Sequence, residues 1–433
     1  VREAANSNIF IDNIRTYLGM DADILSSTGE CELIYRALIH NIEKAGNLKE
    51  DEYYAAIEVG AGNVQISLFN DDYIVFFKSL PFGSLKIKQI YSKYSKNEAN
   101  FFRYVRVIVN NELRSLKKEI PNLKIKTLYG IGSELEDISK NLYGVTEDIL
   151  PIDREDYKRF CSKIQNYTED EIIHKLNIRY DLSETFYASN MMFLKIMNFF
   201  NIDKLHISKV SLRDGILIEM INKEDRENFF KKLENQLQIT AFNIGKSLKF
   251  DEKHSAKVKE FALKIFDETK EIHRLGEIER TYLLVASILH DVGISISSHS
   301  HHKHSLYVIN AQDFFYFNDE EKNIAANIAR YHRRSAPKTS HVEYMKLSDK
   351  NKMTVIKLAG ILRIADSLDN GGLQAIEKIS ISKTKNEKIF INAVAKDNVF
   401  AEIYSFRYKK ELFEEFFGIS VRLRIKRAEY EKK

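Results

Sequence analysis

The segment YYAAIEVGAGNVQISLF, residues 53–69, decides the fold of the first half of this 433-residue chain. Its apolar and polar residues alternate as they do in strands, and Gly60 and Gly62 allow a tight turn at its centre. A third alternating run follows the turn-forming cluster Asn70-Asp71-Asp72. The predicted strands are residues 54–59, 64–69 and 73–79. Together they predict a β-meander.

Strand-like and helical segments alternate on the C-terminal side of this meander. A strand at residues 125–128 runs into Gly130-Ile131-Gly132-Ser133, and a strand at residues 205–210 precedes a turn predicted at residues 213–215. Helical segments fill the intervals between them. This order predicts an α/β domain over residues 1–223.

The remainder of the chain is predicted to form two further domains. Residues 224–375 have the pattern of an all-α domain, and residues 376–433 that of a small α+β domain. In the last strand, apolar residues alternate with the bases Arg422, Arg424 and Lys426. Residues 375–433 hold 14 basic and 9 acidic residues, a surplus of five positive charges. This surplus is either a solvated face or a contact surface for a polyanion.

The composition excludes several classes of protein. With 44% hydrophobic and 30% charged residues the chain is globular, and no apolar run reaches the roughly 18 residues of a membrane span. Two cysteines, Cys31 and Cys161, are too few for a disulfide scaffold. The net charge of +4 does not predict specific nucleic-acid binding. We expect a cytoplasmic protein that does not enter a membrane.

Histidines give the strongest chemical signal, since nine of the twelve lie between His254 and His341. His254 falls on the apolar stripe of its predicted helix, His290 and Asp291 end a long apolar run, and Asp366 lies on another apolar stripe. A buried carboxylate costs several kcal/mol unless it meets a partner or a cation. Two imidazoles and two carboxylates would suit a divalent transition metal. The alternative is a hydrogen-bonded cluster without metal.

The order of these residues, a histidine, then His-Asp, then a distant aspartate, resembles that of the HD superfamily of helical phosphohydrolases. The resemblance implies one or two metal ions that activate water and bind phosphate oxygens. His302, His304 and His332 are candidates for a second metal or for phosphate contact. Arg333 and Arg334 either bind phosphate or form a solvated pair.

Two glycine-rich loops in the α/β region are candidates for phosphate binding. Backbone N–H groups of Gly60, Gly62 and Asn63 could surround an anion, although a plain hairpin turn explains the same residues. The second loop, with Gly130, Gly132 and Ser133, follows a strand and opens a helix, where an anion meets the positive end of the helix dipole. Such a pair of loops resembles the actin-like (ASKHA, ribonuclease H-like) fold.

Taken together, the chain resembles the Ppx/GppA family of exopolyphosphatases and guanosine pentaphosphate phosphohydrolases. The segments that carry the likeness, in order, are VREAANSNIFIDNI, ILSSTGECELIYRAL, YYAAIEVGAGNVQISLF, KSLPFGSLKI, SILHDVGISISSHSHHKHSLYVI and IARYHRRSAPK. The resemblance implies an actin-like phosphatase module followed by an HD-type helical domain. It also implies Mg²⁺ as cofactor, polyphosphate or guanosine penta- or tetraphosphate as ligand, and a homodimer.

The chain departs from the family's catalytic pattern. Gly29 stands at the position of the family's catalytic glutamate, so Glu30 would have to act as the base. Glu58 replaces an aspartate of the first phosphate loop, and Gln65 replaces a glutamate that would help to hold Mg²⁺. The family's first lobe, with its own phosphate loop, is also expected before Val1 and has no counterpart in this sequence.

Three functions therefore stay open. The first is an exopolyphosphatase or guanosine pentaphosphate phosphohydrolase with an impaired actin-like site. The second is an HD-type metal-dependent phosphohydrolase that uses His254, His290, Asp291 and Asp366. The third is a non-catalytic protein that binds guanosine tetraphosphate or polyphosphate and regulates another process.

Overall fold

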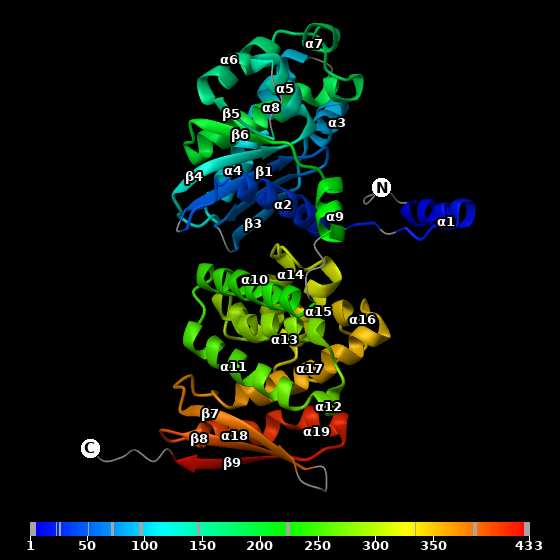
Figure 1. The fold of residues 1–433 in the computed structure, drawn as a ribbon. Helices are drawn as coiled ribbons and strands as arrows, with labels where there is room; N and C mark the ends of the chain where they lie inside the picture. Colours follow the sequence, from blue (N-terminus) through cyan, green and yellow to red (C-terminus); the bar gives the residue numbers. More distant parts are fainter. Residues whose placement is uncertain are drawn as a thin grey trace. The chain divides into compact units, whose positions relative to one another are not determined.

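In a computed structural model, the chain forms two compact units, Val1–Glu224 and Asp225–Lys433, each with its own hydrophobic core (Figure 1). The structure describes residues 6–22, 24–25, 27–50, 52–70, 73–94, 98–144, 148–221, 226–333, 335–383 and 388–427. Asp71 and Asp72 of the predicted turn, the predicted boundary near residue 224 and the candidate phosphate ligand Arg334 lie outside these ranges.

The first unit is built on a six-stranded sheet with the order β3-β2-β1-β4-β6-β5. The strands are β1 (Tyr53–Val59), β2 (Val64–Phe69), β3 (Ile74–Leu80), β4 (Ile125–Ile131), β5 (Ile149–Asp153) and β6 (Lys204–Ser208). β1, β2 and β3 form the predicted antiparallel meander, and β4 and β6 continue the sheet in parallel. The mixed α/β architecture is therefore confirmed.

Nine helices are described in this unit: α1 (Ser7–Leu18), α2 (Ser27–Lys44), α3 (Ser84–Tyr94), α4 (Glu98–Leu116), α5 (Ser133–Tyr143), α6 (Arg154–Ile164), α7 (Glu169–Leu176), α8 (Tyr180–Phe200) and α9 (Leu212–Ile221). α8 is the central one, because most of its side chains are buried and it packs against β1, β4 and the helices α3 to α7. Its buried Phe186, Met192 and Met197 fill the core beside the sheet.

The turn predicted at residues 213–215 is wrong, because these residues lie inside α9. Ser211 and Asp214 cap this helix reciprocally: the Ser211 N–H donates to the Asp214 carboxylate at 2.8 Å, and the Asp214 N–H donates to the Ser211 hydroxyl at 3.4 Å. Gly215 permits α9 to pack closely against α2 and does not form a turn. A Cβ there would lie 2.1 Å from the Leu33 carbonyl oxygen of α2.

The second unit is mainly helical. Its helices are α10 (Arg226–Ser247), α11 (Glu252–Glu268), α12 (Lys270–His273), α13 (Glu277–Leu289), the 3₁₀ turn η1 (Val292–Ser295), α14 (His301–Ala311), α15 (Asp319–Arg330), α16 (Val342–Met345), α17 (Asp349–Ser367), α18 (Phe400–Lys409) and α19 (Glu411–Phe417). The long apolar run predicted to be buried is α13, where residues 281–289 are all buried. α13 and α17 lie at the centre of the unit (Figure 1).

A three-stranded sheet completes this unit, with the order β7 (Ile376–Lys383), β8 (Ile389–Ala395) and β9 (Val421–Arg427). Alternate residues of β8, such as Ile389 and Ile391, belong to the same hydrophobic core as the helices. The shared core does not separate residues 376–433 from the helices, and the domain boundary predicted at residue 375 stays a prediction. The opposite face exposes Arg422, Arg424 and Lys426, as the alternation in the sequence predicts. Among the described residues, no helix is both long and apolar enough to cross a membrane.

His273 is a buried histidine whose protonation state affects stability. Its Nε2 faces the Phe266 carbonyl oxygen at 2.9 Å, and its Nδ1 accepts a hydrogen bond from the Leu275 N–H at 3.0 Å, so the neutral ring is required. Burial lowers the pKa of this imidazole. The unfolded chain, with an ordinary pKa of about 6.5, therefore binds the extra proton first as pH falls.

We expect the free energy of unfolding to decrease between pH 7 and pH 5 for this reason. His273→Leu should cost about 2 kcal/mol at pH 7, because it removes both hydrogen bonds of the ring and leaves the half-buried Leu275 N–H without its acceptor. The variant should also lose less stability than the parent on acidification. Urea unfolding at the two pH values measures both effects. Equal losses in parent and variant would show that other groups cause the pH dependence.

Candidate metal centre

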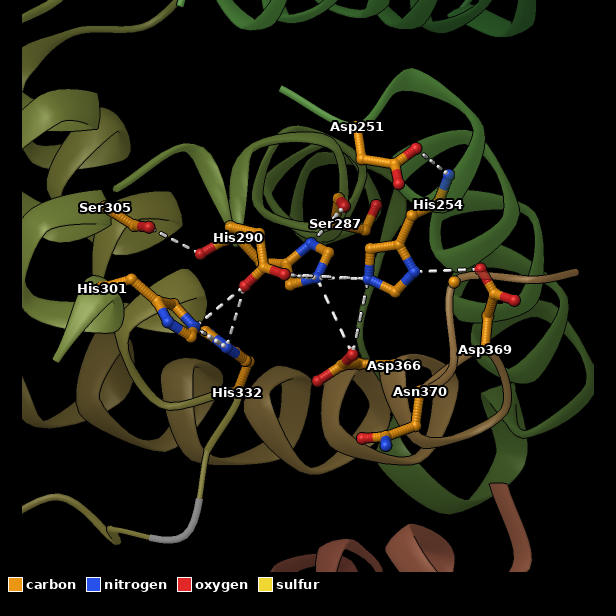
Figure 2. Close-up of polar contacts among 12 residues, drawn as sticks. Asp251, His254, Ser287, His290, His301, Ser305, His332, Asp366, Asp369 and Asn370 are labelled. Atoms are coloured by element: carbon orange, nitrogen blue, oxygen red, sulfur yellow. Dashed lines mark hydrogen bonds and ion pairs between the residues drawn. The ribbon is translucent and has the colours of Figure 1, made fainter. Parts of the chain in front are cut away.

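Four histidines and three aspartates from separate segments meet inside the second unit, and Figure 2 shows most of their contacts. They come from the first turn of α11, the end of α13, the start of α14, the residue pair after α15, and the end of α17 with its following turn. The residues are His254, His290, Asp291, His301, His332, Asp366 and Asp369, all labelled in Figure 2 except Asp291.

Local sequence places these side chains. The Asp251 carboxylate caps α11 by accepting the His254 N–H at 3.0 Å, which fixes His254 in the first turn. The Ser348 hydroxyl caps α17 in the same way by accepting the Asn351 N–H, and Asp366 lies near the other end of that helix. The Ser305 hydroxyl of α14 donates to the His290 carbonyl oxygen at 2.6 Å, which holds α14 against the end of α13.

The four predicted ligands lie together. His254 Nε2 and His290 Nε2 are 3.2 Å apart. Asp291 Oδ2 lies 3.8 and 3.6 Å from these two nitrogens, and Asp366 Oδ1 lies 3.7 and 3.8 Å from them. Donor atoms of His254, His290 and Asp291 lie within 4.8 Å of one another, and Asp366 Oδ1 approaches the two histidines of this set without completing it.

A second group adjoins the first and shares Asp291 with it. Asp291 Oδ1 lies 3.0 Å from His301 Nε2 and 3.3 Å from His332 Nε2, and these nitrogens are 3.2 Å apart. His332 is one of the candidates predicted for a second metal. The other member is His301, whereas the predicted candidates His302 and His304 belong to neither group. The two oxygens of Asp291 thus face different groups.

Each of the four imidazoles is oriented through its Nδ1 atom. The distances are 2.9 Å from His290 to the Ser287 carbonyl oxygen, 2.6 Å from His332 to that of Ala329, 3.1 Å from His301 to that of Ser298, and 2.9 Å from His254 to Asp369 Oδ2. These oxygens accept hydrogen bonds, so Nδ1 carries the proton and the Nε2 lone pair is available to a metal. Ligating histidines in metalloproteins show the same second contact.

The charges around the cluster favour ionised carboxylates. Burial alone would raise the pKa of Asp291, but the imidazoles of His290, His301 and His332 hold it well below its usual range. For Asp366, burial is likewise outweighed by Lys409, which pairs with its Oδ2, so its pKa is also lowered.

The imidazoles differ from one another. Burial lowers the pKa of His290 to about 4, which keeps this ring neutral. Burial would also lower the pKa of His254, but its hydrogen bond to Asp369 and the nearby carboxylates outweigh that effect and raise it.

The residues present fit metal ions. Two sets, His254-His290-Asp291 and Asp291-His301-His332, each place three ligand atoms within 4.8 Å of one another. Neutral imidazole nitrogens and carboxylate oxygens suit borderline divalent ions such as Mn²⁺, Fe²⁺ or Zn²⁺. A carboxylate shared by two sets is typical of centres with two ions about 3.5–4 Å apart.

The two glycine-rich loops of the first unit lie near each other at the carboxyl ends of the neighbouring strands β1 and β4. Glu58, near the end of β1, pairs with Ile131 at the end of β4. The Gly60 N–H donates to the Asn63 carbonyl oxygen at 2.9 Å, which closes a hairpin turn, and Asn63 Nδ2 donates to the Ser79 hydroxyl at 3.1 Å. The carbonyl oxygen of Gly60 accepts the Ser84 N–H at 3.1 Å. No hydrogen bond described for Gly62 adds to this turn.

The second loop contains an unexpected carboxylate. Gly130 lies in β4, Gly132 precedes α5, and Ser133 is the first residue of that helix. The buried Glu134 lies in the first turn, where Ser189 donates a hydrogen bond to its Oε1 at 3.1 Å. A negative side chain thus already faces the positive end of the α5 dipole. Gly29 and Glu30 lie in the first turn of α2.

Comparison with known proteins identifies both units. The description "Ppx/GppA phosphatase family" matches residues 1–224, and "Ppx/GppA phosphatase, domain III" matches residues 237–402. A guanosine-5'-triphosphate,3'-diphosphate pyrophosphatase of Photobacterium profundum is 22% identical over 367 residues, which cover 84% of this chain and 70% of that protein. The Pseudoalteromonas translucida protein of that name is 21% identical over 375 residues, with the same two coverages.

Solved structures give a weaker likeness. An Aquifex aeolicus Ppx/GppA family member has a TM-score of 0.44 at 16% identity and covers 52% of this chain and 72% of its own. An exopolyphosphatase from Cytophaga hutchinsonii has a TM-score of 0.43 at 15% identity, covering 52% and 73%. The family match spans more than half of the present sequence, and the chain therefore belongs to the Ppx/GppA phosphatase family.

Proposed function

We propose that this protein is a metal-dependent phosphohydrolase whose active centre is the histidine–aspartate cluster of the second unit. One observation carries the proposal. In each group two Nε2 atoms face each other at 3.2 Å, while both Nδ1 atoms are already engaged by oxygens. Two lone pairs cannot hydrogen-bond to each other, so wherever both rings of a group are neutral a shared cation satisfies them best. This arrangement supports the resemblance to HD-type hydrolases.

Divalent ions bound to these two groups would supply water activation and charge stabilisation for attack on a phosphoester. Other side chains of the protein provide positive charge for the phosphate and orient the ligands. Arg333 and Lys409 line the pocket that opens onto the ligands, and their positive charges suit phosphate oxygens. The ion pair with Asp366 keeps Lys409 beside the cluster. Asp369 orients His254 through Nδ1.

Metal content tests this proposal directly. We expect the protein, purified without chelators, to carry one to two equivalents of a divalent transition metal, and His290→Ala to lose it because the first group loses a ligand. Elemental analysis of the protein measures the content. His299→Ala is the matched control, since His299 is exposed and belongs to neither group. Less than about a tenth of an equivalent in the parent contradicts the proposal.

The first unit supplies a second candidate function, hydrolysis of polyphosphate or guanosine pentaphosphate with Mg²⁺, as in the names of the relatives. We expect this activity to be impaired, because Gly29 offers no carboxylate and Glu134 lies where the second loop would bind an anion. Binding of these polyanions without hydrolysis is compatible with the same residues. The homodimer and the cytoplasmic location stay predictions.

Phosphate release from guanosine pentaphosphate or polyphosphate with Mg²⁺ separates these possibilities. We expect the parent to release little phosphate. Glu30→Gln should leave this low rate unchanged, because its place next to Gly29 is the sole feature of the sequence pattern that suggests Glu30 as a base. Glu43→Gln, on the solvent side of the same helix, is the matched control. Robust turnover that Glu30→Gln abolishes would show that Glu30 has taken over the catalytic role.

A further inference from the structure

The pocket above the metal centre has a wall that metal binding does not use. The pocket has a volume of about 320 Å³, at the lower end of the range for small-molecule sites, roughly 300–1,000 Å³. The metal ligands line one side of it. The other side comes mainly from α18 and the turn after α17, through Asn370, Tyr404, Ser405, Tyr408 and Lys409.

Two aromatic rings dominate that wall. Tyr404 and Tyr408 lie one helical turn apart, with ring centroids separated by 5.3 Å and ring planes inclined by 64°. They remain 53% and 42% exposed, whereas Phe406 between them is buried in the core. Partly exposed tyrosine rings at a pocket are stacking platforms for a flat ring, and every nucleobase has a flat face that can stack on them.

Polar groups lie between the rings and the metal centre. Ser405 donates a hydrogen bond to Asn370 Oδ1 at 2.9 Å, which orients the amide and leaves its Nδ2 group to donate to a ligand. Lys409 follows Tyr408 directly, and Arg333 adds a second cation on the side of His332. The wall therefore combines aromatic faces, a hydrogen-bond donor and two positive charges.

From these features we propose that the pocket takes a nucleoside monophosphate, with the phosphate at the metal centre and the base against Tyr404 and Tyr408. This inference rests on the proposed function. Water and the nucleotide give a nucleoside and inorganic phosphate. The water oxygen forms the new P–O bond, the ester P–O bond breaks, and the ribose oxygen takes up one of the water protons.

The test compares a nucleotide with the sugar phosphate that carries a C1 hydroxyl in place of the base. With the Mn²⁺-loaded 433-residue chain, kcat/KM for adenosine 5'-monophosphate should exceed that for ribose 5-phosphate by at least about tenfold. The double variant Tyr404→Ala, Tyr408→Ala should bring this ratio close to one, and the corresponding Tyr→Phe double variant should retain it. Phe400→Ala is the control, because Phe400 is a 75% exposed aromatic residue of the same helix outside the pocket.

The outcomes distinguish this inference from the function on which it rests. Equal turnover of both compounds by the parent overturns the nucleotide assignment and leaves the phosphohydrolase intact. If neither compound is hydrolysed, equilibrium dialysis with labelled adenosine 5'-monophosphate decides. Binding that the Tyr→Ala variant loses and the Tyr→Phe variant keeps supports the ligand class while refuting hydrolysis, and absence of binding overturns both.

Discussion

Replacing Asp291 with asparagine will remove metal from at least one of the two groups and reduce phosphoester hydrolysis by more than about a hundredfold. Among the described residues, Asp291 is the one shared by the two metal-binding sets, with Oδ2 toward His254 and His290 and Oδ1 toward His301 and His332. Asparagine has the same shape but one oxygen and no charge. It can serve one group at most, so the expected loss exceeds the roughly 10- to 100-fold cost of changing a residue that only hydrogen-bonds to a ligand.

Elemental analysis and phosphate release with Mn²⁺ measure the two effects. Asp369→Asn is the matched control, because Asp369 contacts the centre only through His254 Nδ1 and is fully buried. This control should weaken metal binding by about 10- to 100-fold and retain measurable activity at high metal concentration. If Asp291→Asn retains two equivalents of metal, the shared-ligand arrangement is wrong.

Gly293→Ala will displace α14 and selectively empty the second group. Gly293 lies in η1 directly after His290 and Asp291, and a Cβ there would lie 2.2 Å from the His301 carbonyl oxygen and 2.4 Å from the Ser305 nitrogen. Both are backbone atoms, so the helix itself must move. Overpacking of this kind costs about 1–3 kcal/mol in the free energy of unfolding. His301, the first residue of α14, moves away from Asp291 with it.

We expect the variant to keep about one equivalent of metal where the parent keeps two, with a lower melting temperature and a large loss of activity. His301→Ala is the comparison, because it removes the same ligand without pushing the backbone. It should reproduce the metal loss with a smaller change in stability. A Gly293→Ala protein with full metal content would show that α14 does not position the second group.

Much of the first metal group could be predicted from the sequence. Helical periodicity placed His254 and Asp366 on apolar stripes, and both are buried. His290 could be placed because it ends the continuous apolar run of α13. In such segments a single burial pattern determines which way each side chain points, so the convergence of the group follows from packing.

The second group could not be predicted in the same way. His299, His301, His302 and His304 lie within six residues, and which of them faces inward depends on where α14 begins. That start is set by Ser300, which adopts the left-handed conformation with φ of 57°, and serine gives no signal for this. Asp369 lies in a turn beyond the periodic part of α17, and Lys409 comes from a helix 43 residues after Asp366.

Similar limits apply to the first unit. The meander was predicted because its strands alternate and glycines separate them. β5 was not, since ILPID is short, contains proline and pairs only at the sheet edge. Gly215 was misassigned because a glycine that permits a turn and one that permits close helix packing look the same in sequence.

The Nδ1 contacts of the cluster have a consequence for how the proposed metal centre would be filled. Three rings take their orientation from main-chain carbonyl groups three residues earlier in the chain, those of Ser287, Ser298 and Ala329. The backbone therefore orients these three rings for metal binding even in the absence of an ion. For the metal centre proposed above, this predicts that one divalent ion exchanges for another without refolding of the chain.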